Sequence, residues 1–152
     1  GEGEALLRTV RVRRDGPNHN PRITRVRIDD VEAPEATPTH LPGCAITGDD
    51  ARRDGCRGHT ITVEFADDAR EPVTVVRADG STATDREALV TEFLVDGGDL
   101  EGAFRSDSDT KGAATTHRNT WRAPATGNVR LWVLVRDGRG GFGVARRSLI
   151  AD

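Results

Sequence analysis

A strict two-residue alternation near the end of the chain constrains the fold more than any other feature. Between residues 129 and 135 every second residue is valine or leucine, whereas Arg130 and Trp132 fall on the other parity. Successive side chains of a β-strand point to opposite faces, so this period predicts a strand buried on one face. The segment DGRGG at 137–141 tolerates positive φ and allows a reversal, which makes 142–150 the neighbouring antiparallel strand.

Other segments have the same character. The segment 88–95 is ambiguous, because it contains helix formers and Asp85 is a possible N-cap, but its β-branched residues and the Asp-Gly-Gly stop at 96–98 favour a strand. Seven or eight strands separated by turns predict an all-β protein, an immunoglobulin-like antiparallel β-sandwich, rather than alternating βαβ units. The remaining strands are expected at 22–29, 59–66 and 72–77, with a short edge strand within 113–121.

The length of 152 residues suits one domain of ordinary size. Residues 6–14 alternate like a short strand, and the cluster of Gly, Pro and Asn at 15–21 interrupts regular structure. We therefore expect residues 1–17 to be a strand and linker, ending a preceding repeat, and residues 18–152 to form the sandwich domain. The polar stretches 30–58 and 100–114 are expected to be long loops.

The two cysteines, Cys44 and Cys56, enclose a polar loop. Zinc needs more ligands at tighter spacing, so a disulfide is the favoured interpretation and a pair of free thiols the alternative. Closing a loop of this length contributes about 3 kcal/mol by restricting the unfolded chain. A disulfide implies an oxidising compartment. Together with a composition typical of GC-rich bacteria, it predicts a periplasmic or extracellular protein of the bacterial cell envelope.

Charge and hydropathy exclude two classes of partner. The formal net charge is −3 and the two signs are interspersed, so there is no basic footprint for nucleic acid or an anionic membrane. No apolar run approaches the roughly 18 residues of a membrane span, which predicts no membrane insertion by this segment. The expected partners are therefore a protein or neighbouring repeat domains.

The second half of the chain resembles immunoglobulin-like domains of bacterial exported or surface proteins, the group that includes PKD and cadherin-like repeats. These often contain a Gly-Gly turn, a W-x-A-P step, a G-x-V-x-L-x-V-x-V strand and a D-x-x-G turn. The segment 18–23 is also similar to the junction that opens such repeats. The matching residues are Gly97, Gly98, Trp121, Ala123, Pro124, Gly127, Val129, Leu131, Val133, Val135, Asp137 and Gly140.

The departures from that group weigh against bound calcium. The Trp-Asp-Phe-Gly-Asp-Gly core of PKD domains is absent, and only Asn18 and Asn20 echo the calcium linker of cadherins. The segment 85–87 is similar to the cadherin Asp-Arg-Glu element, but the strand that follows does not fit that frame. Asp107 and Asp109 are weak calcium candidates, because calcium needs six to eight oxygens and these side chains suit turns and solvated surface. We therefore expect no metal and no cofactor.

The sequence contains no catalytic motif. Four histidines are present, but none has HExxH, GxSxG or P-loop spacing, so we expect a non-enzyme. The favoured function is a structural spacer or assembly domain. The alternative is a recognition or adhesion module that binds a protein or glycan through its long loops; a metal-supported hydrolase is a remote third. Trp121 is expected in the core, and Trp132 is the interface candidate because exposed aromatic residues are enriched at binding hot spots.

Overall fold

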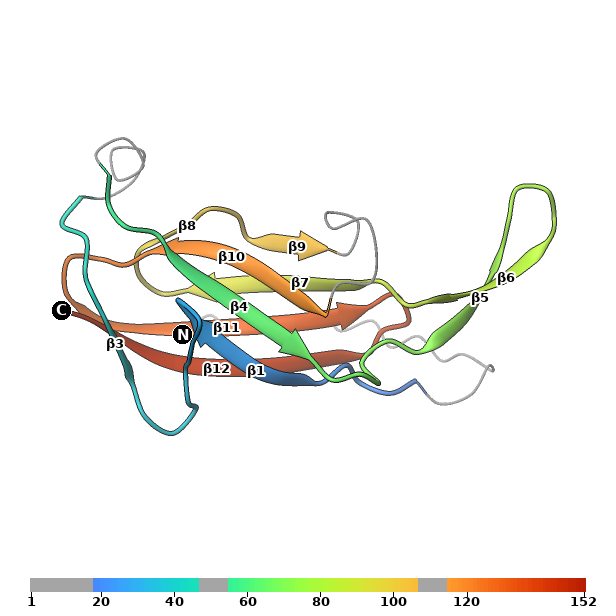
Figure 1. Ribbon diagram of the computed structural model, residues 1–152, viewed down its shortest axis with the longest axis horizontal. Coiled ribbons are helices and arrows are strands. Elements are labelled where there is room, and N and C mark those ends of the chain that lie inside the picture. The colour runs from blue at the N-terminus through green and yellow to red at the C-terminus, as the bar shows by residue number, and fades with distance from the viewer. Residues whose placement is uncertain (1–17, 47–54, 107–114) are drawn as a thin grey trace, which may run out of the picture.

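The computed structural model describes residues 18–46, 55–106 and 115–152. Two five-stranded sheets pack face to face, and a two-stranded ribbon extends beyond them (Figure 1). The first sheet has the order β2 (Val31–Glu32), β1 (Ile23–Ile28), β4 (His59–Phe65), β10 (Thr116–Arg122) and β8 (Asp99–Leu100). The second has the order β3 (Thr39–Leu41), β12 (Phe142–Ala151), β11 (Gly127–Asp137), β7 (Leu89–Val95) and β9 (Phe104–Ser106). The ribbon consists of β5 (Pro72–Val76) and β6 (Thr82–Arg86).

The core lies between the sheets and follows from the alternation in the sequence. The predicted parity of β11 is confirmed, because its valines and leucine at 129–135 are buried while Arg130 is exposed. Trp121 of β10 is fully buried, as expected, and its indole N–H donates to the carbonyl oxygen of Gly97 at 2.9 Å. The core side chains include Val26, Ile28, Leu41, Ile61, Val63, Phe65, Leu89, Phe93, Trp121, Val129, Leu131, Val133, Val135 and Leu149.

The strand order is that of an immunoglobulin-like sandwich. Strands β1, β4 and β10 are neighbours in one sheet, and β12, β11 and β7 are neighbours in the other. In the letter labels of immunoglobulin domains, these are the strand orders A-B-E and G-F-C. All pairings within the two sheets are antiparallel except one, in which β3 runs parallel to the end of β12. The predicted fold class is confirmed, and 88–95 is a strand rather than a helix.

Two predicted loops contain short strands. β2 and β3 lie within 30–58, whereas β8 and β9 lie at 99–106, so the loop predicted over 100–114 was partly wrong. Strands of two or three residues are too short to show an alternation, which is why the sequence pattern missed them. The edge strand predicted within 113–121 is β10, which lies between β4 and β8 rather than at an edge. The strand predicted at 6–14 lies outside the described residues.

The ribbon was predicted only in part. The strand at 72–77 and its turn were expected, but β5 pairs with β6 alone and joins neither sheet. In Figure 1 the ribbon projects from the end of the sandwich at which β7 begins. No sequence pattern indicates this separation, because Val73, Val75 and Val76 are typical of a sheet strand.

Candidate functional site

The outer face of the second sheet carries most of the exposed large apolar side chains. Five of the eight such side chains in the described part of the chain lie on strands of this sheet. Their positions alternate with the buried residues of the same strands, so they point away from the core. These five are Val90, Leu94, Phe104, Phe142 and Val144.

Strand register brings these side chains together around Trp132. Leu94 on one side and Arg146 on the other are the direct neighbours of Trp132. Two residues further along β11, towards the turn into β12, Leu134 lies between Glu92 and Val144. Trp132 and Leu134 are half-buried. We call this surface, made of residues 90, 92, 94, 104, 130, 132, 134, 136, 142, 144 and 146, the outer face.

Trp132 therefore lies where the parity of β11 places it, on the solvent side of the sheet. Its neighbours could not be identified from the sequence, because they belong to β7 and β12 and depend on register. A Trp surrounded by Leu, Val and Arg has the composition of the central part of a protein interface, which is enriched in aromatic residues and Arg.

The outer face has an excess of positive charge. Arg136 forms an ion pair with Glu92, with 2.5 Å between Nη2 and Oε2. Within the described part of the chain, the guanidinium groups of Arg130 and Arg146 have no carboxylate partner, although Asp96 accepts the main-chain N–H of Arg130 at 2.6 Å. Two arginines thus flank Trp132 with their guanidinium groups available to a binding partner.

The predicted disulfide between Cys44 and Cys56 is confirmed, with 5.8 Å between the two Cα atoms. The chain beside it is held on the sandwich by main-chain bonds as well, since Gly43 donates to Asp152 and Cys44 to Pro124, each at 3.0 Å. Residues 47–54 of the enclosed loop lie outside the described residues. The structure therefore describes no surface of this loop from which loop-based recognition, the alternative function, can be argued.

The four histidines do not form a common site. His19 contacts Glu71, His40 contacts Asp152, His59 contacts Asp29, and His117 contacts Thr91. No group of three or more His, Cys, Asp or Glu side chains within 18–46, 55–106 and 115–152 is arranged to hold a metal ion. The weak calcium candidates Asp107 and Asp109 lie outside these ranges.

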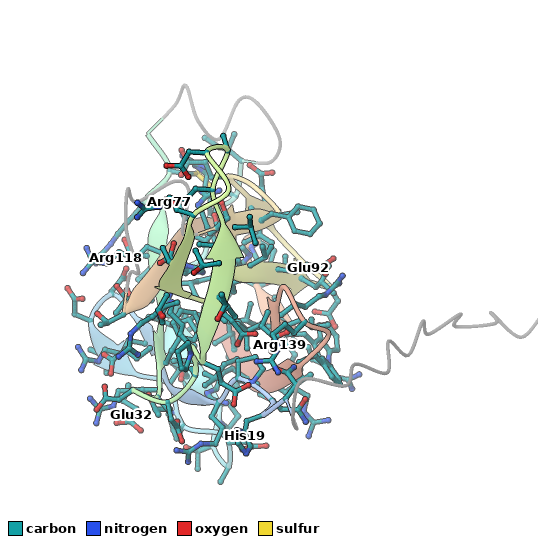
Figure 2. The ribbon with its side chains drawn as sticks, turned by 90° about the vertical axis from the view of Figure 1, so that its right-hand side faces the viewer. His19, Glu32, Arg77, Glu92, Arg118 and Arg139 are labelled. Carbon is teal, nitrogen blue, oxygen red and sulfur yellow. A yellow bond between two sulfur atoms is a disulfide. The ribbon has the colours of Figure 1, made fainter. Side chains whose placement is uncertain are left out.

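A cluster of charged side chains joins the ribbon to the turn between β11 and β12. Arg139 lies between Glu71 and Glu87, with Nη1 at 3.3 Å from Glu71 and Nε at 3.4 Å from Glu87. Figure 2 looks onto this end of the molecule and shows Arg139 beside the ribbon and His19 below it. Burial raises the pKa of the Glu87 carboxyl above its usual value of 4.5, and the charge of Asp137 adds to the shift. The cluster fixes the base of the ribbon, and no spacing in the sequence predicts it.

Comparisons with known proteins supply no assignment. No family model, curated protein or solved structure matches this chain. A search of the described residues for a helix long and apolar enough to cross a membrane also finds none.

Proposed function

We propose that this chain is a non-catalytic assembly module of an exported bacterial protein, and that it binds another protein through the outer face. The observation that carries this proposal is the cross-strand cluster around Trp132, flanked by two arginines without carboxylate partners in the described part of the chain. The disulfide supports an oxidising compartment, because such bonds persist mainly outside the reducing cytosol. The periplasm or the cell exterior is the location that fits.

The apolar content of the outer face favours assembly over a purely passive spacer. A spacer needs contacts only with its neighbours in the chain, at the ends of the sandwich. Contiguous apolar surface on the outer face of a sheet has no role in a spacer, and it promotes aggregation unless a partner covers it. The outer face is thus better explained as a surface that is buried in the assembled state.

The charges specify the chemistry of the partner. A protein that covers Trp132 and Leu134 desolvates Arg130 and Arg146 at the same time, which is costly unless acidic groups meet them. A second copy bound by the same face would bring four of these arginines together. We therefore infer a different protein, with an apolar centre and carboxylates at the rim.

Photo-crosslinking in the cells that produce the protein tests this proposal. A photoreactive benzoylphenylalanine replaces Leu134, and the matched control carries it at Thr120, which is half-buried on the outer side of the first sheet. We expect a specific crosslink only from position 134, to an apolar segment with nearby Asp or Glu. Equal yields from both positions, a crosslink to a basic surface, or a crosslink to a second copy would each overturn the proposal.

Substitutions then measure the contribution of single residues to binding of the crosslinked protein. Trp132→Thr keeps strand propensity and removes the indole, and a hot-spot residue of about 2 kcal/mol corresponds to roughly 30-fold weaker binding. Arg146→Glu should weaken binding to a similar extent. The control is Arg118→Glu, a charge reversal at an exposed position of β10 in the first sheet, which should leave the dissociation constant unchanged.

A further inference from the structure

Both edges of the ribbon are uncovered along their whole length in the described part of the chain. The outermost strands of the sandwich have only two or three residues each: β2 and β8 in the first sheet, β3 and β9 in the second. Among the described residues, β12 also borders no strand on one side over residues 142–148, because β3 pairs with it only from Leu149 to Ala151, but Arg146 and Arg147 place charges at that edge, which opposes association of strands. In contrast, β5 and β6 are five residues long and pair only with each other within the described part of the chain. A two-stranded ribbon is at best marginally stable alone, and additional strands stabilise it.

The register of the ribbon identifies the groups on the open edge of β5. The carbonyl of Glu71 accepts from the N–H of Glu87, and the N–H of Arg77 donates to Ser81, so both residues direct their main chain towards β6. Because these directions alternate along a strand, Thr74 and Val76 direct N–H and C=O to the open edge. Pro72 also faces outward and supplies only a carbonyl. Its missing N–H therefore removes no bond from the ribbon.

The open edge of β6 is less suited to pairing. Its outward residue Arg86 already donates its main-chain N–H to the carboxylate of Asp85 at 2.8 Å. Asp85 and Arg86 also place charges beside this edge, a feature that opposes association of strands. Residues 72–76 of β5 carry no charge, and Val76 is 73% exposed. The edge of β5 is therefore the available one.

We propose that β5 pairs with β5 of a second copy of this chain, antiparallel and about a two-fold axis at Thr74. The N–H of each Thr74 then meets the C=O of the other, and the N–H of each Val76 meets the C=O of Pro72. Every outward donor of the edge is used, and the proline sits where only an acceptor is needed. Val73 faces Val75 of the second copy, and cross-strand pairs of β-branched residues and of threonines are favourable.

Two further features fit this arrangement. In the pair of residues beyond Pro72, Glu71 of one copy lies opposite Arg77 of the other, so Arg77 adds a positive charge beside a carboxylate that also contacts Arg139 and His19. Antiparallel pairing also puts the two sandwiches at opposite ends of the four-stranded ribbon. The partner is a second copy because the sequence of β5 is self-complementary, and an isologous contact requires that property. This inference does not depend on the outer face.

Matched proline variants test the pairing by sedimentation velocity across a concentration series. Thr74→Pro removes one outward N–H and leaves the bonds between β5 and β6 intact, because the main chain of Thr74 does not face β6. Thr84→Pro is the control, since Thr84 lies opposite Thr74 and faces the other edge. We expect a concentration-dependent dimer for the wild type and for Thr84→Pro, and at least tenfold weaker association for Thr74→Pro.

Cysteine trapping gives an independent readout. The two Thr74 residues would have Cα atoms about 5.5 Å apart, within the range that a disulfide spans. Thr74→Cys should therefore form an intermolecular disulfide many times faster than Thr84→Cys. A monomeric wild type at the highest soluble concentration, equal trapping of the two variants, or equal loss of association by the two prolines would overturn the proposal. So would a dimer that Trp132→Thr abolishes and Thr74→Pro does not.

Discussion

Asp29 and Asp30 form the turn between β1 and β2, and both have positive φ, at 50° and 67°. Left-handed backbone is unfavourable for residues other than glycine, so each position needs compensation. The strain at Asp29 is compensated, because its carboxylate accepts a hydrogen bond from the Thr60 N–H at 2.9 Å and contacts His59 at 2.8 Å. Asp30 is exposed, and none of the described contacts involves its side chain. Two adjacent aspartates with similar backbones therefore have different roles.

This difference predicts opposite effects of glycine at the two positions. Asp30→Gly relieves the backbone strain and should raise the free energy of unfolding by about 0.5–1 kcal/mol. Asp29→Gly removes the carboxylate together with the strain and should lower it, by about 2 kcal/mol or more. Urea denaturation measures both. A destabilised Asp30→Gly variant would contradict this account of the turn.

Asp29 also predicts a pH dependence of stability. Burial raises the pKa of its carboxyl, but hydrogen bonds from His59 and Thr60 and the charges of His59 and Arg57 outweigh it, so the pKa lies below 3.8. A lowered folded-state pKa stabilises the protein above pH 3.8, and this stabilisation is lost as the pH falls through the folded value. Asp29→Asn should therefore be less stable than the wild type at neutral pH and lose less stability on acidification. Parallel curves of unfolding free energy against pH would refute this.

At the scale of elements, the long strands could be predicted from the sequence and the short ones could not. The alternation in β11 predicted the strand, the buried face and the outward position of Trp132. Strands as short as β3 have no period to detect, and their pairing depends on contacts across the fold, such as β3 with β12. The contacts of Asp29 with His59 and of Arg139 with Glu87 link residues far apart in the chain, so no local pattern indicates them.

The connection after β3 is held both by the disulfide and by main-chain hydrogen bonds of Gly43 and Cys44. This combination predicts how the connection responds to loss of the disulfide. Replacing both Cys44 and Cys56 with Ser should lower the free energy of unfolding by about 3 kcal/mol through the unfolded state. The far-UV circular dichroism of the folded protein should stay unchanged, because the main-chain bonds of Gly43 and residue 44 remain. Loss of the β-sheet signal in the double-serine variant would show that the disulfide organises the sandwich itself.

Gly43 provides a separate test of the same element. A Cβ at this position would lie 2.0 Å from the main-chain oxygen of Ala125, so the two segments approach closely only because residue 43 is glycine. Gly43→Ala should therefore force them apart and destabilise the protein by about 1–3 kcal/mol. Gly138→Ala is the control, since a Cβ at position 138 would meet no other atom within 4 Å. Equal stability of the two alanine variants, measured by urea denaturation, would show that the close approach is not required.

At the scale of the whole molecule, the two tryptophans report on different regions. Trp121 is fully buried between the sheets, Trp132 is half-buried on the outer face, and the chain has no tyrosine. Trp132→Phe should retain blue-shifted emission that acrylamide quenches poorly until the protein unfolds. Trp121→Phe should emit at longer wavelength and be quenched readily. Similar quenching of the two variants would contradict the outward position of Trp132.

The hairpin of β11 and β12 also has a consequence for biogenesis. Its ten residue pairs form across a short turn, in which the Asp137 carboxylate accepts from the N–H groups of Arg139 and Gly141, each at 2.8 Å. Local pairs close with less loss of chain entropy than distant ones, so we expect this hairpin to form first during folding. It follows all other strands of the described chain, so β1 and β4 leave the ribosome before this nucleus exists. Such an order keeps β1 to β10 without their folding nucleus until this hairpin has been synthesised.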